Sequence, residues 1–316
     1  MWIEYSPHDL SHNPDTENNM PTKPKAKPDL SKLDFKPVPK AVVRSVMAPF
    51  RFYFAPQFYG LEDLDVSKPA IFVTNHTILG VLDGFPFATE IYLRKGLILR
   101  GLADSMHFKI PVWRDWITNS LGAVEASREN CDIIMLRKES LVVFPGGTRE
   151  VCKKRGEKYV LKWSDRRGFV RMAMKHGYDI IPVAAVGGEE AFTITKDAND
   201  ILKSPFGKFL KMIGVAEKYF KNGELMPPMV AGIGDTIIPR PAKLYFSFGK
   251  RISTKQYKKE YENPDVQEVI KKKVEESLLT EFEKLFTIRD KDRDRSKWRR
   301  LLNMKGPKPK EKAKKK

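Results

Sequence analysis

The apolar positions of the chain fall into short, nearly continuous runs separated by longer segments of mixed polarity. Four runs predict buried strands: AIFV at 70–73, SLVVF at 140–144, DIIPVAAVG at 179–187 and KLYFSFG at 243–249. Helix-like segments lie between them, as in RRGFVRMAMKHG at 166–177. Strands that alternate with helices predict an α/β fold, with a mostly parallel central sheet covered by helices on both faces.

The clearest helix follows residue 263. Asn263 is suited to cap it and Pro264 to its first position, and apolar residues recur at helical spacing from Val266 to Leu285. Beyond residue 288 the charges alternate and the chain becomes a lysine-rich tail. The pattern therefore divides the chain into a lead-in at 1–40, a body at 41–288 and a basic tail at 289–316.

The two segments before the first strand differ in character. Residues 1–40 are rich in Pro, Asp, Asn and Lys, a composition typical of disordered chain. Residues 41–60 are apolar and aromatic but are interrupted by two arginines and two prolines. They fit two structures, a first helix packed on the core or an amphipathic segment lying in a membrane interface.

Charge points to an anionic partner. The net charge of the 316 residues is +18, and residues 289–316 hold 14 Lys and Arg against 4 Asp and Glu. Nucleic acid and an anionic membrane surface both fit such a balance, but no nucleic-acid-reading module is evident and the charge is terminal. The sequence shows neither the start of a signal peptide nor a run of about 18 apolar residues. Cys131 and Cys152 lack metal-ligand spacing and are expected to be buried thiols.

His76 is the first candidate for chemistry, because it follows the first predicted strand, where ligands bind in open α/β folds. A single histidine is also compatible with a purely structural role. Imidazole titrates near ~6.5 and acts as a base at neutral pH. The nearest downstream acid, Asp83, is seven residues on, or about 10.5 Å along a continuous helix. Either the chain bends at Gly80 or Asp83 does not orient the histidine.

A second loop, FPGGTRE at 144–150, also follows a predicted strand. Gly146 and Gly147 leave room for a close backbone approach, and three polar residues follow them: Thr148, Arg149 and Glu150. The alternative is an ordinary turn in which Arg149 and Glu150 pair at the surface.

Together these loops resemble blocks I and III of the glycerolipid acyltransferase superfamily, which have the forms His-x4-Asp and Phe-Pro-Glu-Gly-Thr-Arg or a Pro-Gly-Gly variant. Residues 97–130 resemble block II, IIPVAAVGGEE at 180–190 resembles block IV, and PAKLYFSFGKRI at 241–252 resembles the terminal strand of the group. The longer form of the second loop is most similar to the branch containing the plant phytyl-ester synthases and transmembrane protein 68. The block I acid position holds Val81, and the block III acid position holds Gly146.

The resemblance implies an acyl-CoA-dependent O-acyltransferase without a bound cofactor, acting on a mono- or diacylglycerol or a lysophospholipid. It implies His76 and Asp83 as catalytic residues, and substrate binding by the following residues: Arg100, Arg128, Gly146, Gly147, Thr148, Arg149 and Glu150. The expected location is a membrane, on its cytoplasmic face, with the endoplasmic reticulum and lipid droplets as candidates. A non-catalytic relative that binds lipid or acyl-CoA is the main alternative, ahead of a nucleic-acid-binding protein.

Overall fold

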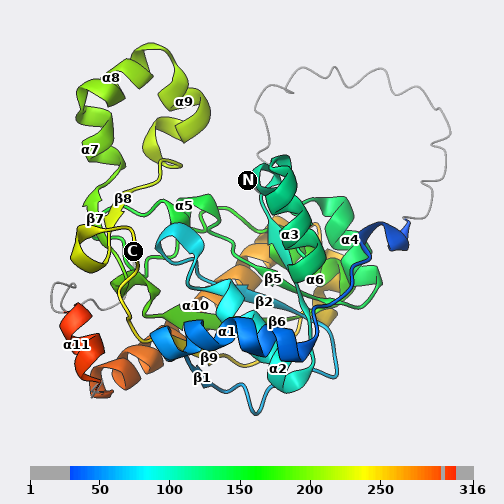
Figure 1. The fold of residues 1–316 in the computed structure, drawn as a ribbon. Coiled ribbons are helices and arrows are strands. Elements are labelled where there is room, and N and C mark those ends of the chain that lie inside the picture. The colour runs from blue at the N-terminus through cyan, green and yellow to red at the C-terminus, as the bar shows by residue number, and fades with distance from the viewer. Residues whose placement is uncertain (1–28, 293–295, 304–316) are drawn as a thin grey trace, which may run out of the picture.

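A seven-stranded sheet forms the centre of the computed structural model, which describes residues 29–292 and 296–303 (Figure 1). Its strands lie in the order β1-β9-β6-β2-β5-β3-β4, and only β6 and β9 pair antiparallel. The strands are β1 (Gln57–Tyr59), β2 (Ala70–Thr74), β3 (Leu99–Ala103), β4 (Val124–Glu125), β5 (Ser140–Val143), β6 (Asp179–Val186) and β9 (Tyr245–Phe248). The mostly parallel sheet expected from the sequence is confirmed.

Helices cover both faces of this sheet. One layer contains α4 (Arg128–Leu136), α6 (Gly168–His176) and the long α10 (Pro264–Lys291), which packs on β6 and β9. The other contains α1 (Lys40–Phe54) and α2 (Gly84–Lys95). Alternate residues of each strand point to opposite layers, so that Val73 and Val143 lie in one core and Phe72 and Val142 in the other. Continuous apolar runs such as AIFV are what a strand buried on both faces requires.

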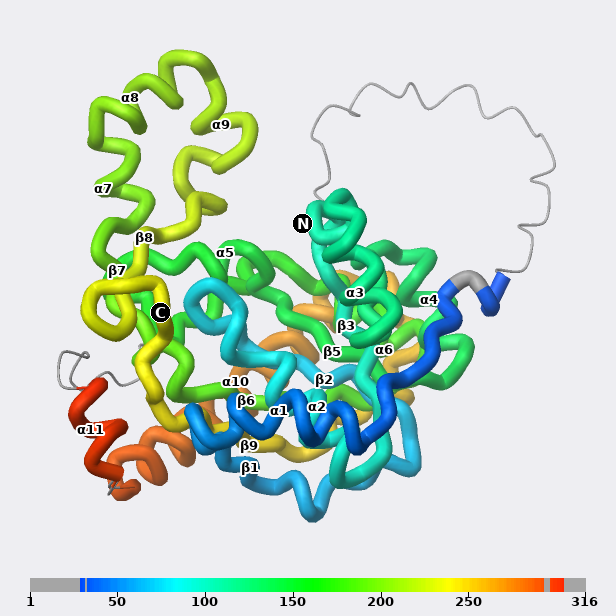
Figure 2. Tube along the Cα trace, in the orientation of Figure 1, coloured from blue at the N-terminus to red at the C-terminus, as the bar shows by residue number. Residues whose placement is uncertain are grey.

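The four predicted strands and the helices at 166–177 and after Asn263 are all present. Asn263 caps α10 through its side chain and Pro264 opens the helix, as expected. Strand β3 was not recognised, because Arg100 and Gly101 interrupt its apolar pattern. Helix α3 (Pro111–Leu121) follows it and rises on one side of the sheet, as Figure 2 shows.

An arm at residues 193–231 extends from the body after β6 (Figure 2). It consists of a two-stranded sheet of β7 (Thr193–Lys196) and β8 (Met229–Ala231), with α7 (Ala198–Lys203), α8 (Pro205–Met212) and α9 (Val215–Phe220) between them. A small core of its own holds it together: Ala198, Leu202, Leu210, Ala216 and Met226. The sequence pattern did not reveal this arm, because its helices are short.

Both predicted terminal boundaries need correction where the structure describes them. Residues 29–40 are not a disordered lead-in, since they form a 3-10 helix at Leu30–Leu33 and then cross the body to α1. At the other end α10 continues past residue 288, and α11 (Lys297–Asn303) packs near α1. The remainder of the lead-in and of the lysine-rich tail, at 1–28 and 304–316, lies outside the described residues.

Segment 41–60 forms α1 and β1, and the interpretation as a helix packed on the core is confirmed. Met47 and Phe54 are buried, and Phe54 belongs to the core that α1 shares with α2. Contact of this segment with a membrane stays a prediction. Within the part of the chain that the structure describes, every helix is too short or too polar to span a bilayer.

Candidate active site

The loop after β2 carries His76 at the carboxyl edge of the sheet. Asn75 fastens this loop to the neighbouring strand β6, because its side chain both donates to the Ala185 carbonyl (3.1 Å) and accepts from the Ala185 N–H (2.9 Å). The imidazole lies against Phe144, with ring centroids 3.8 Å apart and planes 10° from parallel. Its side chain is 19% exposed, which leaves one edge open to a pocket.

His76 and Asp83 form a direct hydrogen bond of 2.9 Å between Nδ1 and Oδ2. The seven-residue separation does not prevent it because the chain does not continue as an α-helix. Leu79 and Gly80 have φ values of +63° and +65°, and they turn the chain before α2 begins. The irregular bend considered for Gly80 is therefore present, and it brings Asp83 to the N-cap of α2 beside the imidazole.

Asp83 is held as a carboxylate by the groups around it. Its Oδ2 also accepts hydrogen bonds from the N–H (2.7 Å) and hydroxyl (3.1 Å) of Thr77, and Oδ1 accepts from the Gly84 N–H (2.6 Å). Burial opposes the charged form, but the His76 imidazole and these donors outweigh it and lower the pKa of Asp83. A carboxylate on Nδ1 favours the imidazole tautomer whose Nε2 is an acceptor, the form required of a base.

The backbone of His76 is fixed at both of its polar groups by buried charged side chains. Glu150 Oε2 accepts the His76 N–H at 2.7 Å, and Lys153 Nζ donates to the His76 carbonyl at 2.7 Å. Lys153 also bonds Glu189 at 2.5 Å, and all three side chains are essentially inaccessible. Burial works against the charge of Lys153, but the carboxylates of Glu189 and Glu150 outweigh it and raise its pKa.

Glu150 thus holds the backbone of the histidine and does not line the pocket, which contradicts the substrate-binding role expected for this residue. Its second oxygen accepts the Lys162 N–H at 2.9 Å. Gly146 makes room for it, since a Cβ there would lie 2.2 Å from the Glu150 carboxyl carbon. Sequence reasoning missed Lys153 and Glu189, which lie 36 residues apart and meet only when β5 and β6 flank β2.

Gly147 and Thr148 border the pocket, and their contact with a substrate stays a prediction. Gly147 adopts a φ of +50°, and a Cβ there would come within 2.8 Å of Arg166, whose guanidinium bonds the Pro145 and Gly146 carbonyls. The Gly147 N–H is donated to the Phe144 carbonyl at 3.0 Å, so it is already used within the loop. Helix α5 (Thr148–Val151) begins directly after it.

The three arginines proposed for substrate do not line this pocket. Arg100 is buried and bonds the Gly122 and Leu33 carbonyls and Glu139, which contradicts a substrate-binding role. Arg128 is exposed at the start of α4. Arg149 bonds Glu224 of the arm at 3.0 Å, and not Glu150 as the surface-pair alternative had it.

The pocket itself has a volume of about 420 Å³ and is mainly apolar. His76, Asp83 and Thr148 line it, together with residues that run from the end of β3 into α3: Ala103, Asp104, His107, Trp113 and Ile117. His107 accepts a hydrogen bond from the Trp113 indole (3.1 Å), which fixes its ring. His176, in contrast, pairs with Asp132 away from the pocket. The described residues contain no group of three His, Cys, Asp or Glu side chains arranged to hold a metal ion.

Comparison with known proteins relates the chain to lipid acyltransferases. Residues 39–290 match the family model described as diacylglycerol acyltransferase. Phytyl ester synthase 1, chloroplastic, from Arabidopsis thaliana is 31% identical over 211 residues, which cover 62% of this chain and 29% of that protein. The human DGAT1/2-independent enzyme synthesizing storage lipids is 30% identical over 136 residues, or 43% of this chain and 41% of its own length.

The chain thus matches less than half the length of either relative. The crystal structure of the 1-acyl-sn-glycerophosphate (LPA) acyltransferase PlsC from Thermotoga maritima aligns with a TM-score of 0.41 and 17% identity, covering 75% of this chain and 78% of that one. The family match, which runs from α1 to the end of α10 and includes both loops of the site, shows that this protein belongs to the diacylglycerol acyltransferase family.

Proposed function

We propose that this protein transfers a fatty acyl group from acyl-CoA to a hydroxyl of a glycerolipid, with His76 as the general base. The observation that carries the proposal is the His76–Asp83 pair, whose imidazole borders a largely apolar pocket. An imidazole oriented by a carboxylate is suited to take a proton from an alcohol, a poor nucleophile at neutral pH.

In the proposed reaction His76 first accepts a proton from the acceptor hydroxyl and later donates it to the leaving group. Nε2 of His76 accepts the proton of the acceptor hydroxyl while the oxygen attacks the thioester carbonyl. Asp83 stabilises the imidazolium that forms. The tetrahedral intermediate then collapses with cleavage of the carbon–sulfur bond, and the His76 imidazolium donates its proton from Nε2 to the leaving sulfur, so that coenzyme A leaves as the thiol and the neutral imidazole is restored. Because the Gly147 N–H is engaged within its loop, we assign the donor to the oxyanion to Thr148, which lines the same pocket as His76.

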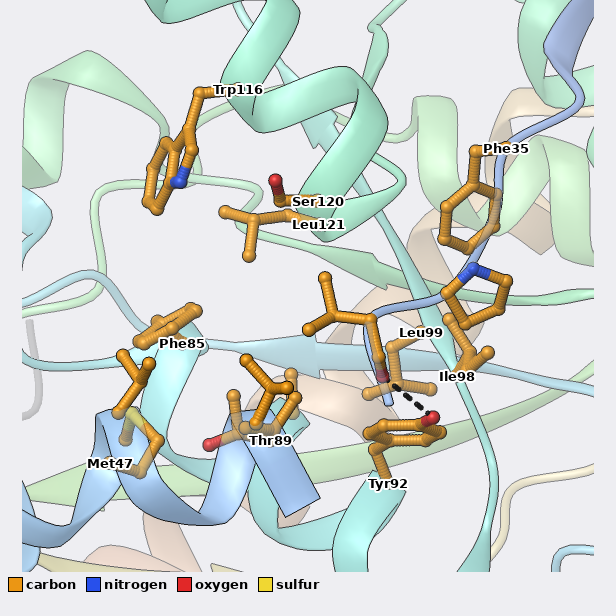
Figure 3. A pocket seen from close by; sticks show the side chains of 16 residues that line it. Phe35, Met47, Phe85, Thr89, Tyr92, Ile98, Leu99, Trp116, Ser120 and Leu121 are labelled. Carbon is orange, nitrogen blue, oxygen red and sulfur yellow. Dashed lines mark hydrogen bonds between the residues drawn. The ribbon is translucent and has the colours of Figure 1, made fainter. Parts of the chain in front are cut away.

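A second cavity, of about 290 Å³, is suited to the acyl chain (Figure 3). It adjoins the catalytic pocket, since Phe85, Ala88, Leu99 and Leu121 line both. Its walls come from α1, α2, α3 and the segment around Phe35, and are overwhelmingly hydrocarbon. Two of its hydroxyls donate to nearby carbonyls, Thr89 to Pro86 (2.9 Å) and Tyr92 to Val38 (2.9 Å), and the second bond is drawn in Figure 3. A largely apolar lining of this kind favours an alkyl chain.

The charge of the catalytic pocket favours a neutral acceptor. Among the described residues that line it, none is a lysine or an arginine. A phosphate monoester, as in lysophosphatidate, is normally bound by such cations. We therefore propose mono- or diacylglycerol, or another neutral lipid alcohol, ahead of lysophosphatidate. The names of the relatives, which refer to a phytyl ester and to storage lipids, agree with this choice.

Such an acceptor resides in a bilayer or a lipid droplet, so we also propose that the protein works at a membrane or droplet surface, with the endoplasmic reticulum as a candidate. Contact between the basic tail and anionic lipid would assist binding by about 1 kcal/mol per Lys or Arg near the surface.

The test is acyl transfer from radiolabelled acyl-CoA to a panel of lipids in mixed vesicles. The panel contains monoacylglycerol, diacylglycerol, a fatty alcohol and lysophosphatidate. We expect label in a neutral acceptor and a loss of at least about a thousandfold in His76→Ala, with His176→Ala as the matched control. Preferred transfer to lysophosphatidate would refute the neutral acceptor. Transfer that persists without His76 would refute the site, and bound acyl-CoA without turnover would support a non-catalytic relative.

A further inference from the structure

The arm presents large apolar side chains that its own core does not use. Phe206, Phe209 and Met212 of α8 are 63%, 50% and 76% exposed. Leu210 is the residue through which this helix enters the buried core of the arm. Helix α8 therefore has apolar residues on both its buried and its solvent-facing sides, an arrangement that a free-standing surface helix does not need.

Helix α3 and the residue before it present a second apolar surface. Ile110 is 59% exposed, Val112 84% and Trp116 46%. Only Ile117 of this helix is buried. Trp116 also lines the acyl-chain cavity, whereas Ile110 and Val112 line neither pocket and are the apolar side chains that this segment leaves to the solvent.

Both surfaces lie on the side of the sheet that carries the catalytic pocket. In Figure 1 the arm and α3 rise on the same side of the sheet, with α5 between them. Trp113 of α3 lines the pocket together with His76. On the opposite side Glu224 of the arm pairs with Arg149 of α5. A flat partner that touched both projections would close over the pocket entrance.

The charge of α8 indicates what kind of partner this is. Lys208 and Lys211 alternate with the exposed apolar residues, and the helix contains no acidic residue. Apolar side chains interspersed with lysines complement a bilayer, whose headgroup layer is anionic and whose interior is hydrocarbon. Protein–protein interfaces, in contrast, are depleted of lysine.

We propose that Phe206, Phe209, Met212, Lys208 and Lys211 of α8, together with Ile110 and Val112 at the start of α3, form a docking surface for a membrane that contains anionic lipid. Helix α1, the segment first considered for this role, offers less. Its exposed Phe52 stacks on Trp298, and its Val42 and Val46 line the acyl-chain cavity. The docking surface is inferred from exposure and charge and does not require the proposed reaction.

The test is co-sedimentation of the full chain with vesicles of phosphatidylcholine containing increasing phosphatidylserine. Phe209→Glu/Met212→Glu and Val112→Glu remove the apolar contacts without touching a pocket-lining residue. Val269→Glu is the matched control, because Val269 is 60% exposed on α10 in the opposite layer. Thermal unfolding verifies that each variant is folded.

We expect the α8 double variant to partition into vesicles on the order of a hundredfold more weakly, and Val112→Glu about tenfold more weakly. Measurement at about 1 M salt separates this contribution from that of the basic tail, because the Debye length falls to about 3 Å. Lys208→Glu/Lys211→Glu should weaken binding only at low salt.

Wild-type binding by the α8 double variant at high salt would overturn the proposal, as would an equal loss in Val269→Glu. A dimer that this variant dissociates, without vesicle binding by the wild type, would assign the surface to a second copy of the chain and likewise overturn it. His76→Ala should bind vesicles like the wild type. Failure of acyl transfer therefore leaves the docking result unaffected.

Discussion

The most specific prediction concerns Lys153, because this side chain supports His76 from inside the protein and does not line the pocket. Its Nζ bonds the His76 carbonyl (2.7 Å) and Glu189 (2.5 Å), and the two side chains are 1% and 0% exposed. Glu189 Oε2 is buried without a hydrogen-bond partner, so Lys153 is the main compensation for its charge. Lys153→Met should lower the free energy of unfolding by about 3–5 kcal/mol, the cost of leaving one member of a buried ion pair uncompensated.

A second variant separates stability from positioning. Replacing the whole pair, in Lys153→Met/Glu189→Leu, should restore most of the lost stability, since a buried ion pair exchanged for apolar residues of similar volume is often neutral. It cannot restore the donor to the His76 carbonyl. We therefore expect kcat to stay about tenfold to a hundredfold below wild type in both variants, with KM for the lipid acceptor nearly unchanged.

The measurements are urea unfolding for stability and initial rates of acyl transfer for kcat and KM, with Lys272→Met on the exposed side of α10 as the control. A loss of stability under about 1 kcal/mol in Lys153→Met would refute the account of the buried pair. Recovery of kcat together with stability in the double variant would refute the positioning role.

Four further predictions concern Asp83, the junction of the two cavities and the two cysteines. Asp83→Asn should lower kcat by about a hundredfold to ten-thousandfold, because an amide cannot accept from both Thr77 and Gly84 and still hold the imidazole tautomer; wild-type rates in this variant would exclude the pair as the catalytic unit. The pKa of Asp83 is lower in the folded protein than in the unfolded chain. Its contribution to stability is therefore present above about pH 4 and is lost as the pH falls through the lowered pKa. Acid unfolding curves of wild type and Asp83→Asn should converge at low pH. Ala88→Phe, at the junction of the two cavities, should reduce transfer of palmitoyl relative to butyryl groups by about tenfold or more, and an unchanged ratio would place the acyl chain elsewhere. Burial raises the pKa of Cys131 to about 12 and that of Cys152 to about 11, so neither thiol should react with a thiol reagent until the protein is unfolded.

The family and the position of the site were readable from short segments of the chain. The apolar runs predicted four strands of the sheet because each of them is buried on both faces, so its pattern does not depend on its neighbours. His76 and FPGGTRE were recognisable as a pair because parallel strands bring their carboxyl ends to one edge. Strand β3 escaped prediction because Arg100 is buried by three partners that are distant in sequence.

What each residue of those loops does was decided only by the tertiary structure. The hydrogen bond between His76 and Asp83 depends on two residues with positive φ, and one of them is Leu79, which no residue preference predicts. The sequence suggests that Glu150 binds substrate. In the structure its side chain is buried, because its carboxylate accepts hydrogen bonds from the backbone N–H groups of His76 and Lys162. Lys153 and Glu189 follow different strands and meet only in the folded sheet. The exposed apolar side chains of α8 can be told from core residues only in the folded arm, where other side chains fill its core. Local pattern determines which segments are buried, whereas a side chain's partner is determined by segments far away in the chain, because hydrogen bonds and ion pairs act over a few ångströms.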